Sequence, residues 1–123
     1  MIIDHCRDEK EFKDFFYKYP MGDGIYSLDF ILNNPNLFCF YNEENGKLEA
    51  FISVCTDETK RLLLSGAGRR KNMQENINAV KMVCNIFDED MFAETDKRPA
   101  QILLLKAQFE KIDNNLYRRK ING

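Results

Sequence analysis

The feature that most constrains the fold is a pair of apolar segments around an Asn-Gly dipeptide. Residues 36–55 read NLFCFYNEENGKLEAFISVC, in which LFCFY and KLEAFISVC flank Asn45-Gly46. Asn-Gly between strand-like segments is a strong β-hairpin signal, because these residue types accept the positive φ angles of the tightest turns. RLLLSG (residues 61–66) follows a short polar stretch, and its consecutive leucines predict a strand buried on both faces. The chain therefore contains a predicted antiparallel meander of three strands.

Upstream of the meander the apolar residues follow a helical spacing. Residues 2–6 predict a short strand, and residues 8–19 predict an amphipathic helix, because their aromatic residues recur every three or four positions. Asp8 can cap this helix, and Glu11 completes a capping-box-like pattern. Residues 25–34 predict a further helix, which the following proline ends.

Downstream of the meander, helices and strands alternate. Residues 70–87 predict a long helix, residues 91–93 a strand, and residues 97–108 a helix with proline in its first turn. Residues 109–121 predict two strands around an Asp-Asn-Asn bend. This order predicts an α/β fold in one domain, residues 1–123, with a mixed, mostly antiparallel sheet and helices on both faces.

The charge balance gives no electrostatic argument for nucleic-acid binding. The 123 residues carry 18 basic and 20 acidic side chains, a net charge of −2, whereas nucleic-acid-binding domains usually present a basic surface. The basic residues form two short clusters, Arg69–Lys71 and Arg118–Lys120. We interpret the second cluster as a solvated tail, and we expect no nucleic-acid partner.

The cysteines indicate a reducing compartment. The four cysteines form no C-x-x-C pair, and a single histidine argues against a zinc site, so we expect no metal. Reduced thiols are typical of cytosolic proteins. The N-terminal residues lack the pattern of a signal peptide, and no apolar segment approaches the length of a membrane span. We therefore expect a cytoplasmic protein without a membrane partner.

A strand that leads through glycine into a helix is a candidate phosphate site. LLLSGAGRRKNMQENI (residues 62–77) has this form. The first N–H groups of a helix are unpaired and carry the positive end of its dipole, so that they can bind a phosphate group. The alternative is that Gly66 and Gly68 only let the chain turn and that the basic residues after them face solvent.

The order of the elements resembles the GCN5-related N-acetyltransferase (GNAT) fold over nearly the whole chain. Residues 96–121 resemble the closing segment of that family, with matches at Ala100, Leu103, Lys106 and Phe109. The same segment departs from the family pattern at three positions: Lys97 replaces the usual asparagine, Leu104 a tyrosine and Gln108 a glycine.

The loop before the long helix gives the second part of the resemblance. When Arg69 takes the first place of the family's acetyl-CoA loop, the two glycine places fall on Asn72 and Gln74, and Ile77 begins the buried face of the helix. Gln74 has a side chain that can crowd a phosphate site. The resemblance implies acetyl-CoA as cofactor, in contact with Leu64, Ser65, Arg69, Arg70, Lys71, Asn72, Met73 and Gln74.

Acetyl transfer to an amine needs a base, and an acid usually protonates the departing thiolate. The family's acid is a tyrosine at the position of Leu104, which cannot donate a proton. Tyr117 is an alternative acid, and Glu49 and Glu94 are candidate bases. Each of these three residues also has a simpler interpretation: Tyr117 as a core aromatic, and the two glutamates as solvated strand residues. Cys84, at an apolar helix position, is interpreted as a core residue.

The resemblance implies an N-acetyltransferase whose acceptor, a small-molecule or protein amine, enters between the first two helices (around Met21–Leu32) and the sheet. The alternative is a GNAT-like protein without catalysis that binds CoA, regulates or mediates protein interaction. A homodimer through an exposed last strand is a further expectation, because unpaired strand edges pair readily.

Overall fold

The computed structural model describes residues 2–19, 26–69 and 73–121. Seven strands of these segments form one open sheet in the order β1-β2-β3-β4-β5-β7-β6. All neighbouring strands are antiparallel except β4 and β5, which are parallel. The strands are β1 (Ile2–Asp4), β2 (Leu37–Tyr41), β3 (Leu48–Thr56), β4 (Leu62–Gly68), β5 (Met91–Glu94), β6 (Glu110–Lys111) and β7 (Leu116–Arg119).

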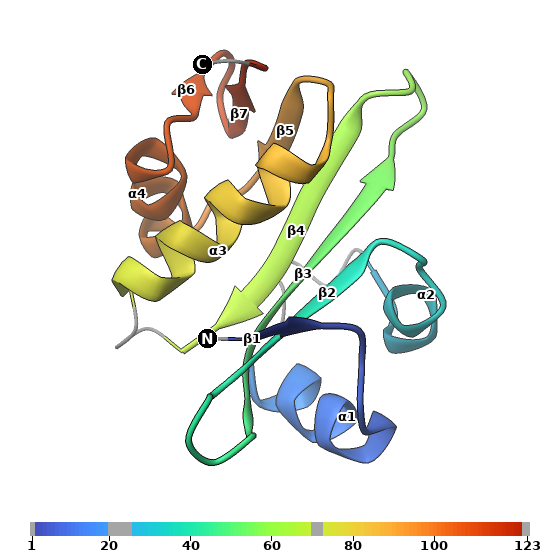
Figure 1. Cartoon of the computed structure of the whole chain (residues 1–123). Coiled ribbons are helices and arrows are strands. Elements are labelled where there is room, and N and C mark those ends of the chain that lie inside the picture. Colours follow the sequence, from blue (N-terminus) through green and yellow to red (C-terminus); the bar gives the residue numbers. More distant parts are fainter. Residues whose placement is uncertain (1, 20–25, 70–72, 122–123) are drawn as a thin grey trace.

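Helices cover both faces of this sheet (Figure 1). They are α1 (Glu9–Lys18), α2 (Leu28–Leu32), α3 (Met73–Ile86) and α4 (Arg98–Lys106). Helices α1 and α2 pack on one face, whereas α3 and α4 pack on the other. The predicted α/β class, with a mostly antiparallel sheet and helices on both faces, is therefore confirmed.

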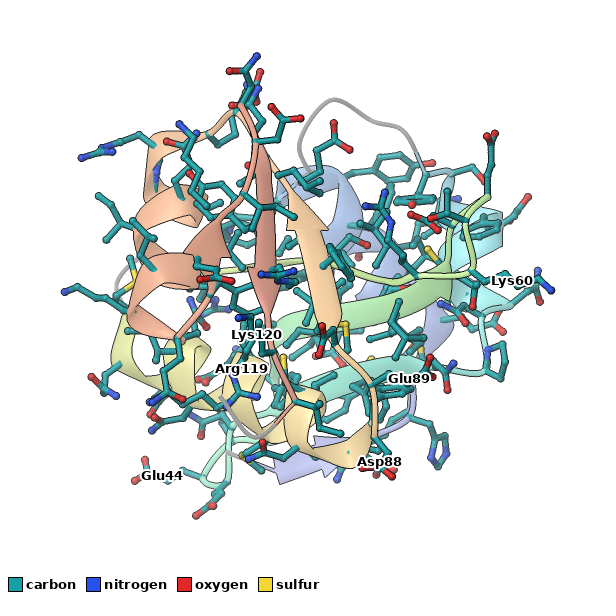
Figure 2. The ribbon with its side chains drawn as sticks, turned by 90° about the horizontal axis from the view of Figure 1, so that it is seen from above. Glu44, Lys60, Asp88, Glu89, Arg119 and Lys120 are labelled. Carbon is teal, nitrogen blue, oxygen red and sulfur yellow. The ribbon has the colours of Figure 1, made fainter. Side chains whose placement is uncertain are left out.

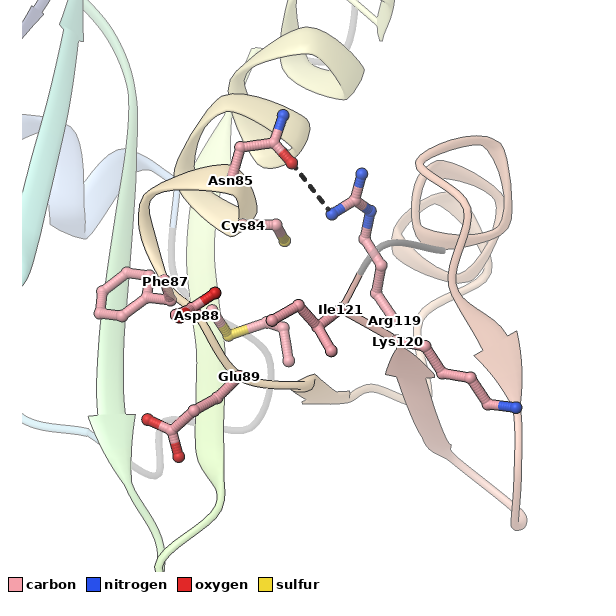
Figure 3. Close-up of a pocket in the computed structure, with 9 residues that line it drawn as sticks. Cys84, Asn85, Phe87, Asp88, Glu89, Arg119, Lys120 and Ile121 are labelled. Carbon is pink, nitrogen blue, oxygen red and sulfur yellow. Dashed lines mark hydrogen bonds between the residues drawn. The ribbon is translucent and has the colours of Figure 1, made fainter.

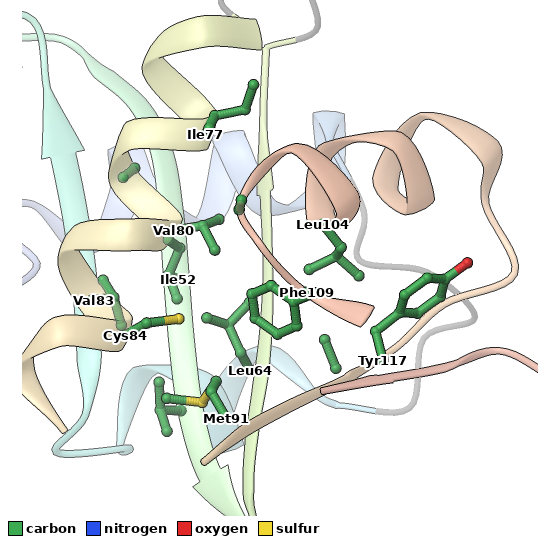
Figure 4. Close-up of a cluster of buried hydrophobic side chains, with 14 of the residues drawn as sticks. Ile52, Leu64, Ile77, Val80, Val83, Cys84, Met91, Leu104, Phe109 and Tyr117 are labelled. Carbon is green, nitrogen blue, oxygen red and sulfur yellow. The ribbon is translucent and has the colours of Figure 1, made fainter. Parts of the chain in front are cut away.

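The period-two alternation of strand residues separates the two cores. On β3, Ala50, Ile52 and Val54 belong to the core under α3, and Phe51 belongs to the core under α1. Figure 4 shows the core on the α3 side, where Phe109 lies beside Leu64. The central strand is thus buried on both faces, as expected for a strand covered by helices on both sides.

The start of α1 confirms one capping prediction and corrects another. The Asp8 side chain accepts hydrogen bonds from the backbone N–H groups of Lys10 and Glu11, so Asp8 caps the helix as predicted. Glu11 does not complete a capping box. Its Oε2 accepts a hydrogen bond of 3.1 Å from the backbone N–H of Leu48 and joins α1 to β3.

The predicted hairpin is confirmed, and it contains a β-bulge. Gly46 has a φ of 69°, and its N–H donates to the Asn42 carbonyl at 2.9 Å. The register shifts between Phe40 and Tyr41, where Tyr41 pairs with Leu48 and leaves Glu49 as the extra residue on β3. Because of the bulge, Glu49 does not follow the regular alternation of strand side chains that the sequence suggested.

The other predicted elements are present with shifted ends. The first strand ends at Asp4, two residues earlier than predicted, and α2 is shorter than the predicted helix over residues 25–34. Residue 25 and residues 70–72 lie outside the described residues. The last strand, β7, lies between β5 and β6, so the expectation that it forms an exposed edge is wrong.

Strand β4 continues two residues beyond its predicted end and includes both glycines of the GAG sequence. Gly66 pairs with Ile52 and Gly68 pairs with Ala50 in a regular antiparallel register. Among the described glycines only Gly46 has a positive φ. The interpretation that Gly66 and Gly68 let the chain turn is therefore wrong, because both are strand residues.

Helix α4 ends in a Schellman motif. The N–H of Phe109 donates to the Leu104 carbonyl at 3.0 Å, and the N–H of Gln108 donates to the Leu105 carbonyl at 3.2 Å. Gln108 has a φ of 74°, a left-handed conformation that favours glycine. Phe109 and Leu104 are both buried, which supplies the apolar contact that accompanies this motif.

We expect Gln108→Gly to stabilise the protein by about 0.5–1 kcal/mol, because a side chain in the left-handed region costs about 1–2 kcal/mol. The gain is reduced by the loss of the 3.3 Å hydrogen bond between Gln108 Oε1 and Arg119. Gln108→Ala is the control, since it loses the same hydrogen bond and keeps the backbone strain. Urea unfolding should rank glycine above glutamine and glutamine above alanine; equal stability of the glycine and alanine variants would contradict this account.

Candidate functional site

The sheet opens between β4 and β5. The two strands pair only at Leu62 with Met91 and at Leu63 with Phe92. Beyond Leu63, residues 64–68 pair with β3 alone, and the end of β5 pairs with β7. In the described part of the chain, the β5 side of residues 64–68 therefore has no strand partner. Alternate N–H and C=O groups of a strand point to each side, so this edge presents open donors and acceptors.

Helix α3 begins shortly after this open edge. Its 14 residues start at Met73, and its first N–H groups are those that a helix leaves unpaired. The Asn76 side chain donates to the Arg69 carbonyl at 3.0 Å and fastens the end of β4 to the first turns of α3. The predicted site residues Arg70, Lys71 and Asn72 lie between these elements, outside the described residues.

The Gln74 side chain is directed along the helix. It is exposed, and its Nε2 donates to Asn78 Oδ1 at 3.1 Å, one turn further toward the C-terminus of α3. In this conformation the Gln74 side chain follows α3 toward its C-terminal end.

Arg69 has an unpaired polar atom at the end of β4. Its backbone N–H donates to the Glu49 carbonyl at 3.4 Å, and its side chain is half-buried. The Nε atom is buried and has no hydrogen-bond partner. A buried donor without a partner is unfavourable by about 1–3 kcal/mol, so an acceptor at this position would stabilise it.

The remaining predicted cofactor contacts divide between the two faces of the sheet. Leu64 is buried in the core under α3, and Met73 packs against the same core. Ser65 points to the other face, since side chains alternate along the strand, and its Oγ donates to the Ser53 carbonyl at 3.4 Å. Leu64 and Ser65 therefore flank the open edge from opposite sides.

The structure does not bring the three predicted catalytic residues together. Glu49 is 8% exposed, accepts a 2.8 Å hydrogen bond from Asn42 Nδ2, and lies on β3, with β4 between it and β5. Tyr117 is 3% exposed and belongs to the core under α3 and α4. Glu94 is exposed, and it faces the opposite side because Tyr117 pairs with its neighbour Ala93. The three side chains thus lie on three different strands, and those of Glu94 and Tyr117 lie on opposite faces of the sheet.

A pair of residues that the sequence did not indicate lies beside the opening. The Cys55 Sγ lies 3.3 Å from the Tyr26 hydroxyl. Cys55 pairs with Leu63, which in turn pairs with Phe92 in the last contact between β4 and β5. Burial, followed by the Cys55 thiol and the charges of Asp57 and Glu94, raises the pKa of Tyr26. The residues are 29 positions apart, so no local sequence pattern could have identified the pair.

A polar hollow of about 170 Å³ lies at the other end of α3 (Figure 3). Its lining includes Cys84, Asp88 and Arg119. Figure 2 shows the molecule from above and labels four residues that line the hollow: Asp88, Glu89, Arg119 and Lys120. In the same view, Glu44 and Lys60 lie at turns on opposite sides of the molecule. The hollow is at the C-terminal end of the helix, so it does not coincide with the predicted phosphate loop at the N-terminal end.

Arg119 joins the ends of two helices. Its Nε donates to the Ala107 carbonyl at 3.1 Å, and its terminal nitrogens donate to Asn85 and Gln108 at 3.4 and 3.3 Å. Arg118, which also belongs to β7, donates a hydrogen bond of 2.6 Å from its Nη2 to the Glu110 Oε1. The interpretation of this cluster as a solvated tail is therefore wrong for Arg118 and Arg119, whereas Lys120 is exposed.

Cys84 is a buried residue of α3. Burial raises the pKa of its thiol to about 11 despite the neighbouring Arg119, so the thiol stays protonated at neutral pH. A protonated thiol is a poor nucleophile. The interpretation of Cys84 as a core residue is confirmed.

Comparisons with known proteins add no assignment to this geometry. Across the described segments, no helix has the length and apolarity required to cross a bilayer, and no group of three His, Cys, Asp or Glu residues is arranged to hold a metal ion. No family model, no curated protein and no solved structure matches the chain.

Proposed function

We propose that the chain is a divergent GNAT domain that transfers an acetyl group from acetyl-CoA to an amine. The observation that carries the proposal is the open edge of β4, residues 64–68, which is followed by the N-terminus of α3. The pantetheine arm of acetyl-CoA is extended and carries amide groups, so it can hydrogen-bond to an open strand edge. Its pyrophosphate then lies near the first N–H groups of α3, where negative charge is favoured.

Two further features support this proposal. The unpaired Nε of Arg69 needs an acceptor, and a phosphate oxygen is a suitable one. The separation of the fourth and fifth strands after the pair of Leu63 with Phe92 also supports the proposal, because it leaves an opening at the edge of β4. The Gln74 side chain, at a glycine position of the family's loop, is directed along α3 toward Asn78.

The second candidate is a GNAT-like domain that binds CoA without catalysis. The separation of Glu49, Glu94 and Tyr117 favours it, as does the burial of Leu104 at the position of the family's acid. A binder retains affinity for CoA and releases no thiol from acetyl-CoA, whereas an enzyme does both. Thiol release with a generic amine therefore distinguishes the two candidates.

Thermal unfolding with millimolar acetyl-CoA tests the binding part of the proposal. A ligand present about a hundredfold above its Kd stabilises the folded state by about 2.7 kcal/mol, so we expect a clear rise in the unfolding midpoint. Dephospho-CoA should give a smaller rise if the basic residues at 69–71 contact the 3′-phosphate. No rise at millimolar acetyl-CoA would contradict the proposal.

The Arg69 contact has its own matched test. We expect Arg69→Met to weaken acetyl-CoA binding by about tenfold or more, since a hydrogen bond to a charged group contributes about 1.5–3 kcal/mol. Lys18→Met, an exposed change on α1, is the control for loss of one positive charge. Isothermal titration calorimetry gives both affinities; equal affinity for the two variants would exclude Arg69 from the site.

A further inference from the structure

We propose that the Tyr26 hydroxyl donates the proton to the departing thiolate, at the point where β4 and β5 separate. This inference rests on the proposed function and concerns its missing acid. Leu104, at the position of the family's acid, cannot donate a proton, and Tyr117 is buried in the core on the α3 side. If the chain supplies an acid, it therefore comes from another part of the fold.

The position of Tyr26 follows from the register of three strands. Cys55, Leu63 and Phe92 form a row across β3, β4 and β5, and the pair of Leu63 with Phe92 is the last one before the strands part. Leu62 and Leu64 face α3, so Leu63 faces the side of α1 and α2. Tyr26 packs on that same side, and its hydroxyl contacts Cys55 in this row.

The surroundings of Tyr26 fix its hydroxyl and keep it protonated. Its ring stacks on Phe30 with centroids 5.2 Å apart and an interplanar angle of 16°. The hydroxyl lies 3.3 Å from the Cys55 Sγ, and a phenolic hydroxyl can accept one hydrogen bond while it donates another. Burial first, and then the Cys55 thiol and the charges of Asp57 and Glu94, raises the pKa of Tyr26, so the phenol carries its proton at neutral pH.

Other tyrosines do not share this position. Tyr41 accepts a hydrogen bond from the backbone N–H of Arg7 beside β1, at the far edge of the sheet. Tyr17 is 63% exposed on α1. Among the tyrosines of the described segments, Tyr26 is the one whose hydroxyl contacts Cys55, in the row where β4 and β5 separate.

The reaction balances with this assignment. The amine nitrogen forms a bond to the acetyl carbon, and the bond between that carbon and the CoA sulfur breaks. The sulfur takes the phenolic proton of Tyr26, and the tyrosinate recovers a proton from the nitrogen of the product through solvent. The products are the acetylated amine and CoA with a free thiol. Glu94, exposed on β5 on the same face, can attract a cationic amine to this position.

The first test compares Tyr26→Phe with Tyr17→Phe in thiol release from acetyl-CoA with a generic amine. We expect Tyr26→Phe to lower kcat by about a hundredfold, the lower end of what general acid catalysis supplies. The affinity for acetyl-CoA, measured by calorimetry, should stay unchanged. Tyr17→Phe, on the exposed face of α1, should match the wild-type protein in both.

Two further readouts separate proton donation from a structural role. The penalty of Tyr26→Phe should shrink with a thioester of a more acidic thiol, which leaves without protonation. In protein with ring-labelled tyrosine, the Tyr26 signal, identified by its loss in Tyr26→Phe, should shift on addition of CoA, whereas the Tyr17 signal should not.

The outcomes distinguish this inference from the proposed function. Absence of acetyl-CoA binding by the wild-type protein overturns both. Binding without thiol release, or an equal kcat for Tyr26→Phe and wild type, overturns the role of Tyr26 and leaves CoA binding intact. A penalty that is the same for every thioester also overturns proton donation.

Discussion

Replacement of Phe51 by alanine should destabilise the protein by about 3–5 kcal/mol, the range for removal of a buried phenylalanine. Phe51 is fully buried at the centre of the core under α1. Its ring lies 4.9 Å from that of Phe12 and 6.1 Å from those of Phe15 and Phe16. The substitution removes these aromatic contacts together and leaves a cavity that the rigid strands around it cannot close.

Urea unfolding followed by circular dichroism measures this loss. Phe51→Leu keeps most of the volume and should lose less than half as much stability, so it gives a graded result if the alanine variant does not fold. Tyr17→Ala removes an exposed ring from the helix that covers Phe51 and should change stability by about 0.5 kcal/mol or less. A loss below about 1 kcal/mol for Phe51→Ala would mean that Phe51 does not organise this core.

The elements of this fold were predictable because their signals are local. The hairpin follows from Asn45-Gly46 between two apolar segments, and α1 follows from aromatic spacing and the cap at Asp8. Ends of elements were harder to predict, since partner strands determine them. Strand β4 continues to Gly68 because β3 supplies a pairing residue at every position up to Ala50.

The candidate site was predictable only in part. The sequence predicted a strand before residues 69–74 and a helix after them; β4 ends at Gly68, and α3 begins at Met73 and so includes Gln74. Sequence could not relate Tyr26 to Cys55, because a tertiary contact over 29 positions leaves no periodic pattern. The same reason explains Arg119, whose partners Asn85 and Ala107 are at the ends of two helices. The sequence suggested that Glu49 is a regular strand residue. The β-bulge that displaces it is not marked by any residue type in the strand, so the sequence could not reveal it.

Gly66→Ala should destabilise the protein by about 3 kcal/mol, at the upper end of the cost of overpacking, because the new atom meets backbone. A Cβ at Gly66 would lie 2.3 Å from the Phe51 carbonyl oxygen and 3.1 Å from the Ile52 Cα. Backbone atoms cannot rotate away, so β3 and β4 must move apart and weaken the register that positions residues 64–68.

Gly68→Ala is the matched control on the same strand. A Cβ there would lie 3.0 Å from the Asn76 Oδ1 and 3.1 Å from the Ala50 Cβ, and the Asn76 side chain can turn aside with loss of its hydrogen bond to the Arg69 carbonyl. This loss is partly offset because alanine is less flexible than glycine in the unfolded chain, so we expect Gly68→Ala to destabilise the protein by about 1 kcal/mol. Denaturant unfolding compares the two variants, and equal losses would show that glycine at 66 is not needed for the approach of the strands. If Gly66→Ala loses more stability than Gly68→Ala, then Gly66 is needed for the close approach of β3 and β4. The position of the open edge of β4 depends on that approach.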